Sequence, residues 1–117
     1  MNIQIIGTKS CQDTRKAERY FKERRIPYQF RDLKEKGLSE KELNRIAQKV
    51  DPDDLLDREG KQFKKRQMEY MVFDTKEELL EDPLLLKTPI VRNGKYEVAV
   101  GHQPDRWQQW IDEADES

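Results

Sequence analysis

The stretch from Ile3 to Ala17 constrains the fold of this chain most, because it joins an apolar strand to a helix through a turn. The isoleucine-rich run that ends at Gly7 predicts a short buried strand. A helical pattern begins near Cys11, the only cysteine of the chain. This cysteine is therefore predicted to lie beside the unpaired N–H groups of a first helical turn.

Two interpretations of Cys11 follow from this position. Ser10 is predicted to cap the helix, which places Cys11 at the first helical position, near the positive end of the helix dipole. Such a site favours the thiolate, which is the nucleophilic form, and Arg15 and Lys16 add positive charge within about one turn. In the other interpretation Cys11 is a small apolar residue packed under a turn, as unpaired cysteines often are.

Length and charge limit what the chain can be. Its 117 residues are enough for one domain, and 23 basic against 24 acidic side chains give no net field that favours nucleic acid or membranes. No signal segment and no apolar run of membrane-spanning length is visible. A single cysteine cannot form an internal disulfide, so we expect a reducing, cytoplasmic location. We also expect a monomer with one domain over residues 1–117.

The first third of the chain reads as strand, helix and strand. Residues 11–24 place Thr14, Ala17 and Phe21 at helical spacing, with charged residues on the other face. A proline ends this helix, and residues 28–31 alternate as a strand does. Two strands joined by a helix predict a parallel pair.

The middle of the chain is predicted to be a helical insert over about residues 36–86. Capping boxes at Ser39–Glu42 and Thr75–Glu78 each predict the start of a helix. The basic run Lys61–Arg66 can contact an acidic partner or a glutathione carboxylate, or it can be a solvated helix face.

The last third returns to strands. Residues 90–92 and 95–100 flank Asn93-Gly94, which predicts a two-residue hairpin turn. Pro104 suits the first turn of a final helix, whose Trp107 and Trp110 are expected to cover the sheet. The whole order, βαβ, helical insert and ββα, predicts an α/β fold with a four-stranded mixed sheet.

Four short motifs, in the right order, carry a family resemblance. The chain resembles the ArsC/Spx family, a thioredoxin-like group that includes glutaredoxin-coupled arsenate reductases and the Spx transcription regulators. Within it, the chain looks closer to uncharacterised ArsC-related members than to true arsenate reductases. The matching stretches are Ser10–Ala17, Leu55-Leu56-Asp57-Arg58 followed by Phe63-Lys64-Lys65, Leu86–Val91, and Val100-Gly101 with Pro104.

The resemblance implies roles for particular residues. Cys11 matches the nucleophilic cysteine of the reductases, and Thr88-Pro89 matches a proline that is usually cis and faces this cysteine. Arg58 matches an arginine that helps to hold the oxyanion, and its alternative role is that of a solvated surface arginine. Lys87 offers a further positive charge next to Thr88.

The departures from the family pattern bear on the reaction. The reductases use three arginines, whereas this chain has Thr88 and Gln103 at two of those positions, so arsenate reduction is not expected. Thr14 stands where Spx has the second cysteine of its Cys-x-x-Cys switch, which excludes an internal disulfide. Cys-x-x-Thr is the pattern of a monothiol site, and alternatively Thr14 can hydrogen-bond the thiolate and lower its pKa.

The first functional hypothesis is a thiol-dependent oxidoreductase with an unknown substrate, in which Cys11 forms a mixed disulfide with glutathione or a partner thiol. Glutathione would be a co-substrate, glutaredoxin or thioredoxin a possible partner, and no metal or bound cofactor is expected. The alternative is an Spx-like regulatory module that binds a protein such as RNA polymerase. Besides the catalytic Cys11, the predicted substrate-binding residues are Thr14, Arg15, Arg58, Lys87, Thr88 and Pro89.

Overall fold

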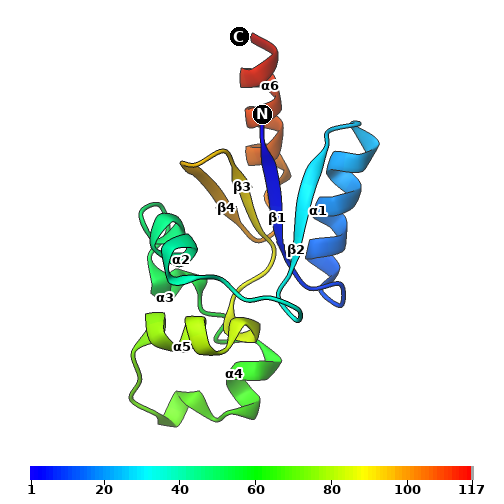
Figure 1. The fold of residues 1–117 in the computed structure, drawn as a ribbon. Coiled ribbons are helices and arrows are strands. Elements are labelled where there is room, and N and C mark those ends of the chain that lie inside the picture. The colour runs from blue at the N-terminus through cyan, green and yellow to red at the C-terminus, as the bar shows by residue number, and fades with distance from the viewer. Residues whose placement is uncertain (117) are drawn as a thin grey trace. The chain divides into compact units, whose positions relative to one another are not determined.

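The computed structural model describes residues 1–116 and divides the chain into two compact units (Figure 1). The first unit combines Met1–Asp32 with the chain from Thr88 onward, and the second is Leu33–Lys87. The predicted fold class is confirmed, because strands occur at both ends of the chain and helices occupy the segment between them.

The first unit is built on a four-stranded mixed sheet in the order β2-β1-β3-β4. β1 pairs with β2 in parallel and with β3 antiparallel, and β3 and β4 form an antiparallel hairpin. Residues at the end of β1 therefore lie beside the start of β3, since Ile6 pairs with Ile90. The elements are β1 (Ile3–Gly7), α1 (Gln12–Glu23), β2 (Tyr28–Asp32), β3 (Ile90–Asn93), β4 (Glu97–Val100) and α6 (Pro104–Glu116).

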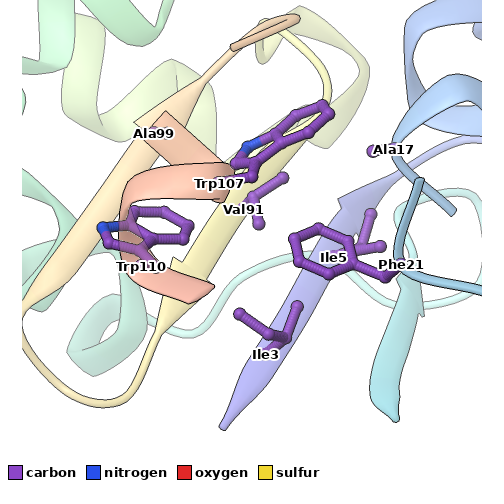
Figure 2. Close-up of a cluster of buried hydrophobic side chains, with 8 residues drawn as sticks. All are labelled: Ile3, Ile5, Ala17, Phe21, Val91, Ala99, Trp107 and Trp110. Atoms are coloured by element: carbon purple, nitrogen blue, oxygen red, sulfur yellow. The ribbon is translucent and has the colours of Figure 1, made fainter. Parts of the chain in front are cut away.

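One face of this sheet is covered by α1 and α6. Figure 2 shows strand side chains directed toward the aromatic rings of the two helices. Both tryptophans are buried in this core, as their helical spacing predicted, and Trp107 packs against Phe21 with 5.7 Å between ring centroids. The buried cluster consists of Ile3, Ile5, Ala17, Phe21, Val91, Ala99, Trp107 and Trp110.

The turn between β3 and β4 differs from the prediction. Asn93 belongs to β3 and pairs with Glu97, so the turn has three residues, 94–96, and not the two predicted. Only Gly94 adopts a positive φ, 65°, and a single left-handed residue suits a three-residue turn. The backbone register of Asn93 with Ile3 explains why it continues the strand.

The second unit is helical, and its first helix starts as predicted. Ser39 accepts a hydrogen bond from the Glu42 backbone, and the Glu42 carboxylate accepts one from the Ser39 N–H, which completes a capping box. The second predicted box is wrong: Asp74, and not Thr75, is the N-cap and accepts from the Glu77 N–H. The helices are α2 (Glu40–Ala47), α3 (Pro52–Leu55), α4 (Lys61–Lys65), η1 (Met68–Tyr70), α5 (Thr75–Glu81) and η2 (Pro83–Leu85).

Leucines and one ion-pair cluster hold the second unit together. Leu56 and Leu86 form an antiparallel bridge, and both side chains are buried. Arg66 donates to Glu78 at 2.7 Å and to Asp82 at 3.1 Å, which ties α4 to α5 and to the residue after it. Among the described residues, the structure contains no helix of the length and apolar character needed to cross a membrane.

Candidate functional site: a cysteine at the start of the first helix

Cys11 is itself the residue that begins α1. It is the N-cap, with φ −80° and ψ 120°, and its carbonyl accepts the first intrahelical bond from Arg15 at 3.1 Å. Its own N–H donates to the Thr8 carbonyl at 3.1 Å, which closes the turn after β1. The predicted cap is therefore wrong by one position: Ser10 lies outside the helix, and its hydroxyl lies 3.3 Å from that of Thr8.

A cap position directs the Cys11 side chain toward the N–H groups of the first turn. Its thiol makes no capping hydrogen bond in the protonated form and donates to the Thr88 carbonyl, with 3.7 Å between Sγ and the oxygen. The Thr88-Pro89 bond is cis, as predicted, and Pro89 is buried. The neighbouring positions of β1 and β3 in the sheet bring together these two residues, which are 77 positions apart.

Thr14 lies one helical turn after the cysteine and is completely buried. Its hydroxyl oxygen has no hydrogen-bond partner within residues 1–116. A buried hydroxyl without a partner is costly, and a thiolate at Cys11 would supply an acceptor. Thr14 can reach this place only because Gly7 has no side chain: a Cβ on Gly7 would lie 2.8 Å from the Thr14 methyl carbon.

These surroundings change the acidity of the cysteine. Partial burial raises the pKa of Cys11, but hydrogen bonds from the Thr14 and Thr88 side chains and from the Thr14 and Asp13 N–H groups outweigh it. The net result is a pKa below the ordinary cysteine value. A half-buried cysteine with a lowered pKa has the environment of a reactive thiol rather than of an inert core residue.

Arg15 contacts the turn before α1. Its guanidinium donates to the Lys9 carbonyl at 2.8 Å and so fastens the turn that leads into α1. The causes of the lowered Cys11 pKa are hydrogen bonds from uncharged groups. Arg15 nevertheless keeps an exposed charge on the same helix, one turn from the cysteine.

The remaining predicted site residues, Arg58 and Lys87, belong to the second unit. Arg58 is exposed, with its guanidinium carbon 5.7 Å from the centroid of the Phe63 ring. Lys87 is exposed, and its backbone N–H donates to the Leu55 carbonyl at 2.7 Å. The structure thus brings Cys11 and Thr88 together in the first unit and assigns these two cations to the other.

Two polar residues before α6 have structural contacts. Gln103 donates to the Val100 carbonyl at 2.6 Å, and the exposed His102 ring lies edge-on to Trp107 at 5.6 Å. Throughout residues 1–116, His, Cys, Asp and Glu side chains form no group of three or more that could hold a metal ion.

The sequence alone predicts no role for Gly7 except as the end of a strand. Its backbone does not have a positive φ, so conformation alone does not require glycine there. Glycine is required there because the Thr14 side chain packs against this position. The sequence does contain a glycine four positions before the cysteine. Its role depends on the contact with Thr14, which only the tertiary structure contains.

A mixed sheet with this strand order, a cis proline before β3 and a cysteine at the start of α1 define a thioredoxin-like protein. The chain belongs to the ArsC family, whose model matches residues 6–110.

Known relatives include both regulators and reductase-like proteins. The chain is 31% identical to the global transcriptional regulator Spx 2 of Oceanobacillus iheyensis, over 95% of this chain and 84% of the relative. It resembles the solved structure of the YFFB protein, with a TM-score of 0.79, 26% identity, and 92% and 96% of the two chains covered. An ArsC-related protein from Brucella melitensis has a TM-score of 0.69 at 28% identity, with 95% of each chain covered.

Proposed function

We propose that this protein is a monothiol oxidoreductase of the ArsC-related group, which forms a mixed disulfide between Cys11 and glutathione or a partner thiol. The observation that carries the proposal is the contact set of Cys11: a cap position on α1, a lowered pKa, and a buried Thr14 hydroxyl that has no other acceptor. These features favour the thiolate, the form that attacks disulfides.

The reaction needs two thiol–disulfide exchanges. The Cys11 thiolate attacks one sulfur of an oxidised substrate, a Cys11–substrate S–S bond forms, and the other sulfur leaves with the electron pair and takes a proton from solvent. An external thiolate then attacks the mixed disulfide and releases Cys11. Because the chain has one cysteine, the second thiol must come from another molecule. The leaving half of the substrate ends as a thiol, and the half that Cys11 had bound ends in a disulfide with the external thiol, so the two exchanges balance.

The other residues have supporting roles in this proposal. The Thr14 and Thr88 side chains donate hydrogen bonds to the thiolate, and the Thr88 carbonyl accepts from the protonated thiol. Arg58 and Lys87 are the proposed anion-binding side chains of the second unit. Arsenate is not the proposed substrate, because two of the three arginine positions of the reductases are Thr88 and Gln103 here. One unpaired cysteine suits a reducing compartment, so we place this activity in the cytoplasm.

The rate of Cys11 alkylation by iodoacetamide against pH tests this proposal. Since Cys11 is the only cysteine, the whole rate comes from it, and Cys11→Ser provides the blank. We expect a midpoint below the ordinary value of about 8.5 and a glutathione adduct when the protein meets oxidised glutathione. A normal midpoint, or reaction only after unfolding, would contradict the proposal.

A second function is supported by the 31% identity to the Spx 2 regulator. In that case the chain is a protein-binding module, with RNA polymerase as the candidate partner. Thr14 stands in place of a second cysteine, so this module would lack an internal disulfide switch. Recovery of RNA polymerase from a lysate by both the wild type and Cys11→Ser would favour this function over the thiol reaction.

A further inference from the structure

The exposed side of α1 carries mostly positive charge. Its other side packs into the core through Thr14, Ala17 and Phe21, and most of the remaining positions are exposed. Glu23 is the only fully exposed acidic residue of this helix. The exposed basic residues, from the helix and the two positions after it, are Arg15, Lys16, Arg19, Lys22, Arg24 and Arg25.

Part of this charge lies in line with the cysteine. Arg15, Arg19 and Lys22 follow Cys11 by 4, 8 and 11 positions, a spacing that places them in one stripe along the helix. We call these three residues the basic stripe. Lys22 follows Cys11 by 11 positions, so the stripe extends about 16 Å along the helix from the cysteine.

The charges at the far end of the basic stripe are not neutralised within the molecule. Arg19 and Lys22 form no ion pair with any residue between 1 and 116. Glu18, which could have paired with Lys22, instead accepts a hydrogen bond from the Tyr28 hydroxyl at 3.1 Å. These cations are therefore free to meet a partner's carboxylates.

We propose that the basic stripe docks an acidic protein whose thiol attacks the Cys11 mixed disulfide. This inference rests on the proposed monothiol function and specifies its partner. A molecule that lies along the stripe reaches Cys11 at one end, so docking and thiol exchange occur together. Glutathione, a tripeptide, is too short to follow the stripe to Lys22, since three extended residues span only about 10 Å.

An acidic protein fits this surface better than a nucleic acid does. The chain has a net charge of −1 and a pI of about 5.9, whereas nucleic-acid-binding domains are commonly strongly basic. The last turns of α6 in the same unit expose Asp112, Glu113 and Asp115, which would repel a long polyanion.

Thiol peptides of matched length test the proposal. Cys11 is first converted by dipyridyl disulfide to its thiopyridyl mixed disulfide, and eight-residue peptides with one cysteine and flanking Glu, Gln or Lys then attack Cys11 Sγ. Release of thiopyridone gives each rate. Dividing it by the rate of the same peptide with free dipyridyl disulfide removes differences in peptide thiol pKa.

We expect the Glu peptide to react at least about fivefold faster than the Lys peptide at low ionic strength, with the ratio falling as salt is added. Arg19→Glu/Lys22→Glu should remove this preference. The matched control is Lys95→Glu, an exposed charge reversal in the turn after β3, where the register places it at the opposite end of β1 from Cys11. Arg19→Glu alone is compared with Lys95→Glu, because each of these variants reverses one exposed charge.

The possible results test the docking proposal separately from the thiol reaction. Equal rates for the Glu and Lys peptides, or a preference that Lys95→Glu removes and the α1 reversals do not, would overturn the docking proposal while the thiol reaction stands. Duplex DNA that binds the wild type but not the double variant at physiological salt would also overturn it and assign the face to nucleic acid. A Cys11 that forms no adduct in the native state defeats both proposals.

Discussion

The Thr14 side chain occupies the space that a side chain on Gly7 would need. A Cβ at Gly7 would lie 2.8 Å from the Thr14 methyl carbon, closer than real Cβ atoms approach, and Gly7 has no positive φ that would itself disfavour alanine. The end of β1 and the first turn of α1 are therefore fitted to each other at this pair. Two of the predictions below concern this pair, one concerns Tyr28 and Glu18, and one compares the caps of α1 and α2.

Gly7→Ala should destabilise the protein by about 1–3 kcal/mol, because overpacking forces Thr14 or the strand to shift. Urea unfolding followed by circular dichroism measures the change. In a Thr14→Ala background the hydroxyl and the Cγ2 methyl are absent and only the Cβ, 3.1 Å away, remains, so the cost should fall below about 1 kcal/mol. Equal costs in the two backgrounds would show that Thr14 is not the residue that excludes a side chain at Gly7.

Thr14→Val should raise the Cys11 pKa, because valine keeps the volume but removes the hydroxyl that stabilises the thiolate. Alkylation at pH 7 should then be slower, whereas Thr14→Ser, which keeps the hydroxyl, should stay closer to the wild type. An unchanged pH profile in Thr14→Val would mean that the lowered pKa comes from the backbone N–H groups and Thr88 alone.

Stability should also depend on pH through Tyr28. Burial, and then the hydrogen bond and charge of Glu18, raise the pKa of its phenol to about 12. A raised folded-state pKa stabilises the fold fully below the unfolded value of about 10, and this contribution is lost as pH rises toward about 12. The difference in unfolding free energy between the wild type and Tyr28→Phe should therefore shrink over that range. A constant difference would contradict the raised pKa.

Two serine substitutions distinguish the cap that the structure contains from the one that sequence predicts. Ser39→Ala should cost about 1 kcal/mol, because alanine removes the hydroxyl that accepts from the Glu42 N–H and caps α2. Ser10→Ala should cost less than about 0.5 kcal/mol, since Cys11 occupies the cap position of α1. Thermal unfolding of the two variants gives the comparison, and equal losses would contradict the assignment of the caps.

Local patterns predicted the elements of this fold well. The helix at Ser39 follows from a box of four consecutive residues, and both strands of the parallel pair follow from short alternating or apolar runs. Such patterns depend on hydrogen bonds and faces within a few residues, so sequence alone carries them. Where two capping residues stood side by side, as at Asp74 and Thr75, the sequence could not decide between them.

The sequence by itself determined that a cysteine stands where a strand turns into a helix, and that no second cysteine can close a disulfide within the chain. Only the tertiary structure decided what surrounds that sulfur. The Thr88 carbonyl reaches it through the pairing of β1 with β3, and the buried Thr14 hydroxyl through its close approach to Gly7. The physical reason is that the acidity of a thiol depends on the donors and the burial around it, which the chain assembles from distant segments.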